Sequence, residues 1–166
     1  NYFVNKIFFQ DGVPIPLQTM AFTPEESLLM ASAYLDCVDH TSIRVPYKTL
    51  FVFNAPIINC PGISTMDYGN GFNLRTTWRS GLAQNEKPKE IWFFGGSTTY
   101  SVYTSDDNTI PSVAARTLEE NGIAANVINF GMSGLNHAYE LNNLITALRE
   151  FPSKPDLVIF YDGYND

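Results

Sequence analysis

Three short and almost unbroken apolar runs, at residues 91–94, 127–130 and 157–161, constrain the fold of this chain more than any other feature. They start 36 residues apart (91 to 127) and 30 residues apart (127 to 157), and each gap fits a βαβ crossover of about 30 residues. Continuous apolar runs of this length indicate strands that are covered on both faces by helices. The sequence therefore predicts an α/β fold, a three-layer α/β/α arrangement with a doubly wound, flavodoxin-like parallel sheet.

Each gap between these runs contains apolar residues at helical spacing. The first predicted helix is capped by Asn108 or Thr109 and ends before Gly122. Its apolar positions are Ile110, Val113, Ala114 and Leu118. The second is closed by Pro152, and its apolar positions are Leu141, Leu144, Ile145 and Leu148.

The first half of the chain has a different character. We divide the chain into an irregular N-terminal region, residues 1–88, and the first part of an α/β core, residues 89–166. The N-terminal region is expected to hold a hairpin at the Asp11-Gly12 turn and one helix that starts at Thr23. A strand at 47–54 and a long glycine-containing loop at 60–79 complete this region.

Composition excludes several classes of partner. Hydrophobic residues make up 45% and charged residues 16% of the chain, which is ordinary for a globular domain. The net charge of −7 argues against nucleic acid or an anionic membrane as the main partner. No apolar run approaches the ~20 residues of a membrane span. Cys37 and Cys60 fit no metal motif, and two buried thiols are favoured over one disulfide in an exported protein. The compartment stays open, with export or the cell envelope favoured over the cytoplasm.

Ligands of such sheets bind outside the carboxyl ends of the strands, so the residues after each run are the functional candidates. After the first run, two glycines let the chain turn sharply and present the Ser97 hydroxyl. After the second, Gly134 offers a backbone N–H, and after the third, Asn165 offers a side-chain amide. Taken singly, each is compatible with a plain turn residue. Together, a hydroxyl and three donors (the N–H groups of Ser97 and Gly134, and the Asn165 amide) are what a tetrahedral acyl-transfer intermediate requires.

These motifs resemble the conserved blocks of the SGNH (GDSL-like) serine hydrolases. The sequence Gly-Gly-Ser-Thr-Thr at 95–99 resembles the first block, with Gly96 where the name motif has Asp. Asn-Phe-Gly-Met-Ser-Gly at 129–134 resembles the second, and Gly-Tyr-Asn-Asp at 163–166 matches the third. The resemblance covers residues 88–166, and Arg75 before it is reminiscent of bacterial members. It implies that Ser97 is the nucleophile and that Gly134 and Asn165 complete the oxyanion hole.

One departure from the family concerns the general base. The fourth block, an Asp-x-x-His near the C-terminus of family members, is not in this sequence, and neither His40 nor His137 follows an Asp by three residues. We therefore expect a fragment whose sheet is incomplete at the C-terminus and which by itself has little activity. His137 and Tyr164 are possible substrate contacts. Tyr161 could line an acyl or sugar subsite with Tyr164, although aromatic packing is its favoured role. Asp106 and Asp107 are interpreted as favourable charges at a helix N-terminus.

The resemblance implies a carboxylic ester hydrolase or acyltransferase that acts through an acyl-Ser97 intermediate. Acylated carbohydrates or small lipid esters are the implied substrates, with no cofactor and no metal. Two alternatives remain open at this point. One is a flavodoxin-like protein that binds phosphate or flavin at residues 95–99, and the other is a non-catalytic protein of the same fold that binds carbohydrate or serves as a scaffold.

Overall fold

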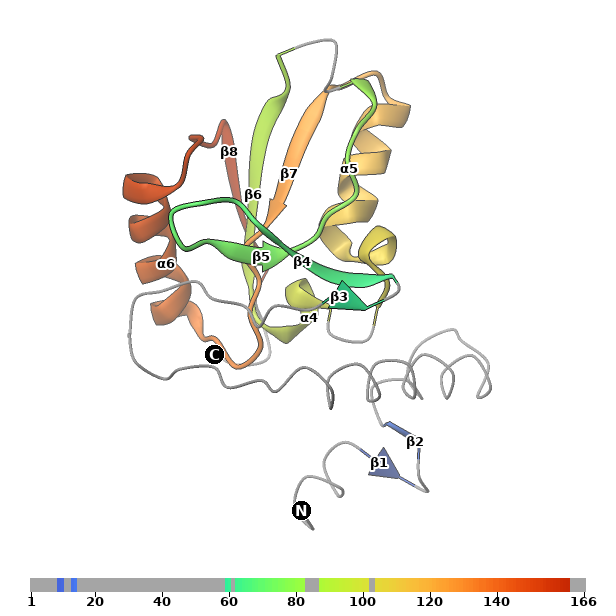
Figure 1. Cartoon of the computed structure of the whole chain (residues 1–166), viewed down its shortest axis with the longest axis vertical. Helices are drawn as coiled ribbons and strands as arrows, with labels where there is room; N and C mark the ends of the chain where they lie inside the picture. Colours follow the sequence, from blue (N-terminus) through green and yellow to red (C-terminus); the bar gives the residue numbers. More distant parts are fainter. Residues whose placement is uncertain are drawn as a thin grey trace. The chain divides into compact units, whose positions relative to one another are not determined.

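The computed structural model describes residues 9–10, 13–14, 59–60, 62–82, 87–101 and 104–161 (Figure 1). The chain forms two compact units, Asn1–Ser42 and Ile43–Asp166. The described part of the first unit is an antiparallel pair of short strands, β1 (Phe9–Gln10) and β2 (Val13–Pro14). Gln10 pairs with Val13, so these strands flank the predicted Asp11-Gly12 turn. The helix expected from Thr23 and the strand expected at 47–54 lie outside the described residues.

The second unit is built on a mixed six-stranded sheet with the order β3-β4-β5-β7-β6-β8. Its centre is the parallel trio β7 (Ala125–Asn129), β6 (Lys89–Gly95) and β8 (Leu157–Tyr161). These strands contain the three apolar runs. The predicted α/β class and the parallel pairing of its core strands are confirmed.

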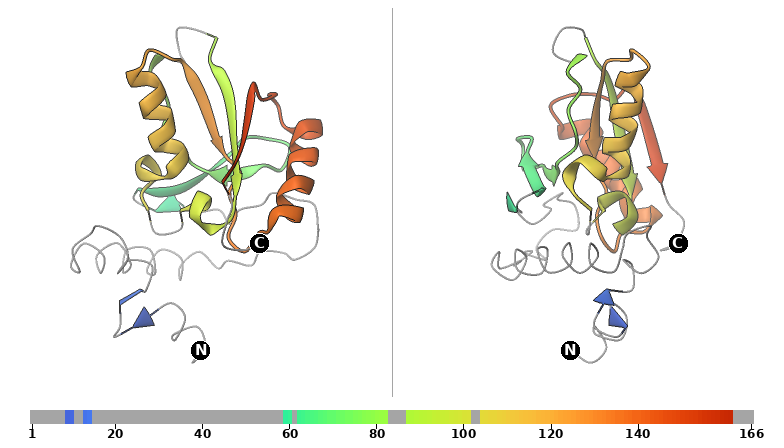
Figure 2. Two further views of the ribbon diagram at one scale, coloured as in Figure 1. Left: turned by 180° about the vertical axis from the view of Figure 1, so that it is seen from behind. Right: turned by 90° about the vertical axis from the view of Figure 1, so that its right-hand side faces the viewer.

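Two helices cover opposite faces of β6 (Figure 2). Ile91 and Phe93 pack toward Ala115 of α5 (Ile110–Glu120), whereas Trp92 and Phe94 pack in a cluster with Ala147 of α6 (His137–Glu150). The strand order explains this arrangement. The chain crosses from β6 to β7 in one direction and from β7 to β8 in the other, and right-handed crossovers in opposite directions place their helices on opposite faces.

The caps of both helices follow from local sequence. The Thr109 hydroxyl accepts a hydrogen bond from the Ser112 N–H at 3.2 Å, and Pro111 occupies the first turn of α5, where its missing N–H costs nothing. The Asn136 side chain accepts from the Tyr139 N–H at 3.3 Å and caps α6. The apolar positions of α6 are a correction to the sequence analysis, because Leu141, Ile145 and Leu148 lie on its exposed face.

The prediction of one long loop at 60–79 is wrong. It contains β4 (Ile63–Asp67) and β5 (Asn73–Arg75), which pair antiparallel through a tight turn at 69–71. All three turn residues have positive φ, so its glycines serve the turn and not a long loop. A further short strand, β3 (Asn59–Cys60), pairs with β4, and β5 pairs with β7 at Arg75 and Asn129. The boundary that the sequence suggested at 88 therefore falls inside the second unit.

Cys60 is buried and disulfide-bonded, which corrects the interpretation of two buried thiols. The chain's other cysteine, Cys37, lies outside the described residues. No helix in the described part of the chain has the length and apolar character needed to cross a membrane.

Candidate active site

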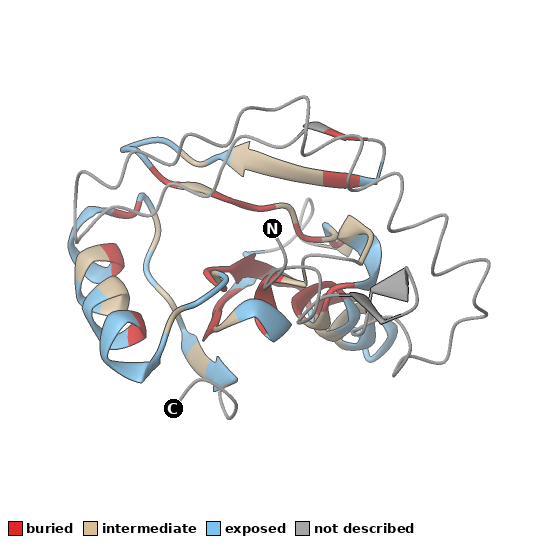
Figure 3. Cartoon of the chain, turned by 90° about the horizontal axis from the view of Figure 1, so that it is seen from below, coloured by how far each residue is buried: buried red, intermediate tan, exposed pale blue. Residues whose placement is uncertain are grey.

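The three parallel strands end at one edge of the sheet. Phe93 of β6 is in register with Asn129 at the end of β7, and Gly95 is in register with Tyr161 at the end of β8. Because β6 lies between the other two, the chain reverses its winding direction here, and in open α/β sheets ligands bind at such a switch point. Figure 3 views the molecule toward this carboxyl edge.

Ser97 begins a helix of four residues, α4 (Ser97–Tyr100), directly after β6. Gly96 precedes it in an extended conformation, and the N–H of Ser101 closes the helix by donating to the Ser97 carbonyl at 2.9 Å. Thr99 and Tyr100 are buried, whereas Ser97 is exposed. The buried half of α4 anchors the helix, and Ser97 lies on its exposed half.

Gly95 is required because the chain packs against itself at this point. A Cβ on Gly95 would lie 2.1 Å from Oγ1 of Thr99 and 2.5 Å from the carbonyl oxygen of Tyr161. The sequence predicts a sharp turn at Gly95 and Gly96 before Ser97. At Gly95 the room for a side chain is taken by Thr99, whose hydroxyl donates to the Tyr161 carbonyl at 3.3 Å. This glycine thus allows α4 to be bonded to the end of β8.

The segment after β7 stays beside β6 for two further residues. The Phe130 N–H donates to the Phe93 carbonyl at 2.8 Å, and the Met132 N–H donates to the Gly95 carbonyl at 3.0 Å. Gly134 follows with φ of +79°, and a Cβ there would meet no atom within 4 Å. Glycine is therefore needed at 134 for backbone conformation and not for space. The Gly134 turn and Ser97 both lie at the carboxyl edge.

The other predicted site residues have different outcomes. His137 is the first residue of α6, it is exposed, and its ring centroid lies 5.6 Å from that of Phe160 on β8. Asn165 and Tyr164 lie outside the described residues, as does His40. Tyr161, at the end of β8, is 48% exposed.

An ion pair that the sequence analysis did not predict joins the buried Arg75 side chain to the half-buried Asp106. Arg75, 1% exposed, pairs with Asp106 and donates to the carbonyl oxygens of Ser64 at 2.9 Å and Thr104 at 2.6 Å. The Ser64 hydroxyl donates to Asp106 at 2.6 Å. Asp106 is therefore more than a charge at a helix end, because it joins the β4–β5 hairpin to the segment that follows α4. An arginine inside a short strand and an aspartate soon after the Ser97 segment were the signals that could have identified this pair.

The same cluster influences the last residue of α4. Burial raises the pKa of the Tyr100 hydroxyl above its ordinary value, since it disfavours the phenolate. Arg75 acts in the opposite direction and Asp106 in the same direction as burial. Tyr100 is thus a neutral phenol at physiological pH. Within the described residues, no group of three or more His, Cys, Asp or Glu side chains is arranged to hold a metal ion.

No protein-family model and no curated protein matches the chain. Among solved structures, the chain is similar to the crystal structure of AlinE4, an SGNH-hydrolase family esterase, with 31% identity and a TM-score of 0.46. The match covers 49% of this chain and 43% of that chain. Two mutants of the same esterase match with the same coverage and TM-score, at 31% and 30% identity. The chain thus spans less than half the length of the esterase.

Proposed function

We propose that this chain carries the nucleophile and the oxyanion-binding half of a serine ester hydrolase of the SGNH type. We also propose that the fold of this hydrolase has three α/β/α layers. The observation that carries the proposal is the exposed Ser97 hydroxyl at the carboxyl edge, on a short helix held against the Gly134 loop and the end of β8. The motif resemblance supports the same assignment. The proposal rests on this chain's own residues and not on the likeness to a solved esterase.

In the proposed reaction, Oγ of Ser97 attacks the carbonyl carbon of an ester while a base accepts the hydroxyl proton. The carbonyl oxygen becomes an oxyanion, which accepts hydrogen bonds from the backbone N–H groups of Ser97 and Gly134 and from the Asn165 amide. Collapse of this intermediate breaks the ester C–O bond, and the departing alkoxide takes the proton from the base. Water, deprotonated by the same base, then hydrolyses the acyl-Ser97 ester, or another alcohol accepts the acyl group.

Each donor to the oxyanion contributes about 3 kcal/mol of transition-state stabilisation in a site without water. The geometry around Ser97 favours such a contribution, because backbone donors held by buried contacts need no reorganisation when charge develops. For the base, we propose an Asp-x-x-His block in the full-length protein, as the family resemblance implies. His137 is a candidate for contact with the substrate. Small acyl groups on carbohydrates or simple lipid esters are the proposed substrates.

The test is covalent labelling of the full-length protein with a fluorophosphonate, followed by peptide mapping. Ser97 is the expected site, and Ser97→Ala should abolish labelling because the attacking oxygen is removed. Ser101→Ala is the matched control at the C-cap of the same helix and should keep labelling, because the Ser101 hydroxyl is engaged locally and donates to the Thr98 carbonyl at 2.8 Å. Labelling at another serine would contradict the proposal. A folded protein that is not labelled would favour a scaffold or flavin-binding role.

A further inference from the structure

We propose that Asn129 is a positioning residue for the Ser97 nucleophile, because its buried amide fixes α4 to the loop that leads to Gly134. This inference rests on the proposed function. Asn129 is the last residue of β7, and its side chain is fully buried at 0% exposure. The motif resemblance included this residue in the second block without a role.

Both the nitrogen and the oxygen of the Asn129 side-chain amide form hydrogen bonds. Its Nδ2 donates to the carbonyl oxygen of Thr99 in α4 at 2.8 Å, and its Oδ1 accepts from the N–H of Gly131 at 2.8 Å. A carboxylate at this position would lack the donor, and an apolar side chain would lack both groups. Only an amide therefore satisfies both backbone groups in a site from which water is excluded.

The two backbone groups belong to the two segments that the proposed reaction needs. Thr99 lies two residues after Ser97, and Gly131 lies three residues before Gly134. The two segments pack too closely for a side chain at Gly131, since a Cβ there would lie 2.6 Å from the Tyr100 nitrogen and 2.8 Å from the Thr99 carbonyl carbon. Asn129 thus sets the separation between the nucleophile and one oxyanion donor.

Thr99 extends the link to the third strand. This residue is also fully buried, and its hydroxyl donates to the Tyr161 carbonyl, which precedes the segment with Asn165. A displacement of about 1 Å in such a constellation costs on the order of 10²-fold in rate. Because Asn129 reaches the chemistry only through Thr99 and Gly131, its loss should lower kcat and leave KM little changed.

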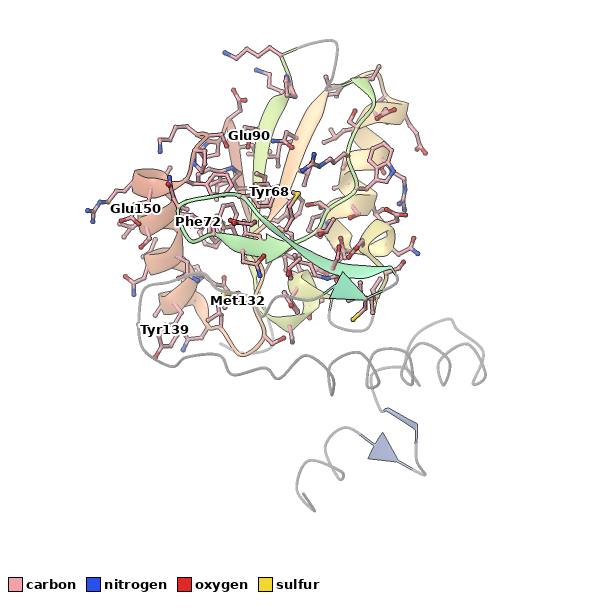
Figure 4. All side chains as sticks on the ribbon, viewed as in Figure 1. Tyr68, Phe72, Glu90, Met132, Tyr139 and Glu150 are labelled. Atoms are coloured by element: carbon pink, nitrogen blue, oxygen red, sulfur yellow. The ribbon has the colours of Figure 1, made fainter. Side chains whose placement is uncertain are left out.

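The chain offers a matched control on the same strand. Asn126 lies three residues before Asn129, and its Nδ2 donates to both carboxylate oxygens of Glu90, at 2.8 and 3.1 Å. Glu90 lies at the end of the sheet opposite to Met132, which follows Gly131 (Figure 4). Asn126→Asp is the same isosteric change, and it places a carboxylate beside Glu90. It should destabilise the fold without reaching the carboxyl edge.

The experiment compares the parent full-length protein with Asn129→Asp and Asn126→Asp, using ester hydrolysis, the rate of fluorophosphonate labelling at Ser97, and thermal unfolding. Asn129→Asp places a carboxylate oxygen against the Thr99 carbonyl oxygen. It should lower kcat and the labelling rate about 10²-fold, and its KM should stay within about twofold of the parent value. Asn126→Asp should keep both rates. Backbone hydrogen exchange at Gly131 and in α4 should accelerate in Asn129→Asp alone, and this readout does not depend on activity.

A folded Asn129→Asp with unchanged kcat, labelling rate and exchange would overturn the inference while leaving the proposed function intact. An equal loss of kcat in Asn126→Asp would also overturn it, since the effect would then be general destabilisation. A parent that is not labelled at Ser97 would instead be a failure of the proposed function. If Asn129→Asp does not fold, Asn129→Ala tests the same link, because it removes both hydrogen bonds without placing a charge in the buried site. It should also slow labelling at Ser97, and an unchanged rate would contradict the inference.

Discussion

Strands β6 and β8 have similar apolar sequences and lie side by side in parallel, yet their environments differ. Trp92 and Phe94 of β6 are fully buried, whereas Leu157 and Tyr161 of β8 are 50% and 48% exposed. Figure 3 shows the same contrast, with β8 in the colours of intermediate and exposed residues. β6 has a partner on each side and a helix on each face. Within the described residues, β8 pairs only with β6.

This comparison teaches that an apolar run predicts a strand but does not determine how deeply the strand is buried. How deeply a strand is buried depends on the strands and helices that pack against it. α6 shows the same effect, since Leu141, Ile145 and Leu148 are 43–50% exposed while Ala147 on its other face is fully buried. At the carboxyl edge of β6, hydrogen bonds join α4, the segment that follows β7 and the last residue of β8.

The largest expected effect comes from the same substitution at two residues that are register partners. Phe94 on β6 is 0% exposed, and its partner Phe160 on β8 is 36% exposed. Phe94→Ala should lower the free energy of unfolding by about 3–5 kcal/mol, because it leaves a cavity in the core. Phe160→Ala should cost about 1 kcal/mol, mainly through lost ring contacts. Chemical denaturation of both variants measures the difference, and equal losses would mean that β8 is covered in solution.

Gly95→Ala should have a smaller effect on stability but a clear effect on the site. The new methyl group would collide with Thr99 and the Tyr161 carbonyl, and overpacking of this kind costs about 1–3 kcal/mol. Since relief of the collision requires α4 to move, labelling at Ser97 should also be slowed. Gly122→Ala is a useful control, because Gly122 has φ of +74° but no neighbour within 4 Å and lies past the end of α5. A normal labelling rate in Gly95→Ala would show that the close packing is dispensable.

The smallest effect is expected at the amino ends of the same two strands. The Asp156 carboxylate accepts the Glu90 N–H at 2.9 Å, and this bond lowers the pKa of Asp156, with Lys89 as a further contributor. A lowered pKa in the folded state stabilises the fold at neutral pH, and this contribution disappears as pH falls through that pKa. The melting temperature of Asp156→Asn should therefore lie slightly below that of the parent at pH 7. This difference in melting temperature should disappear below about pH 4. A difference that widens in acid would contradict this account.

The sequence predicted the parallel core strands, the two helices and a cap at Asn108 or Thr109, of which Thr109 is the cap in the structure. These features depend on local periodicity and on residues that are close along the chain. The sequence also placed Ser97 and Gly134 after strands that share one edge. It did not predict the β4–β5 hairpin, whose strands are short and whose glycines are typical of loops. The Arg75–Asp106 pair and the Asn129–Thr99 bond were not predicted either, because they join segments about 30 residues apart in sequence.

The central claim is that the segments after β6, β7 and β8 converge on one reacting atom. A crystal structure of the full-length protein with a phosphonate bound to Ser97 tests it most directly. We predict a covalent bond from Oγ of Ser97 to phosphorus. The phosphoryl oxygen should lie about 3 Å from the backbone nitrogens of Ser97 and Gly134 and from Nδ2 of Asn165. A phosphoryl oxygen that points to solvent, or a Gly134 N–H directed away from it, would contradict the account.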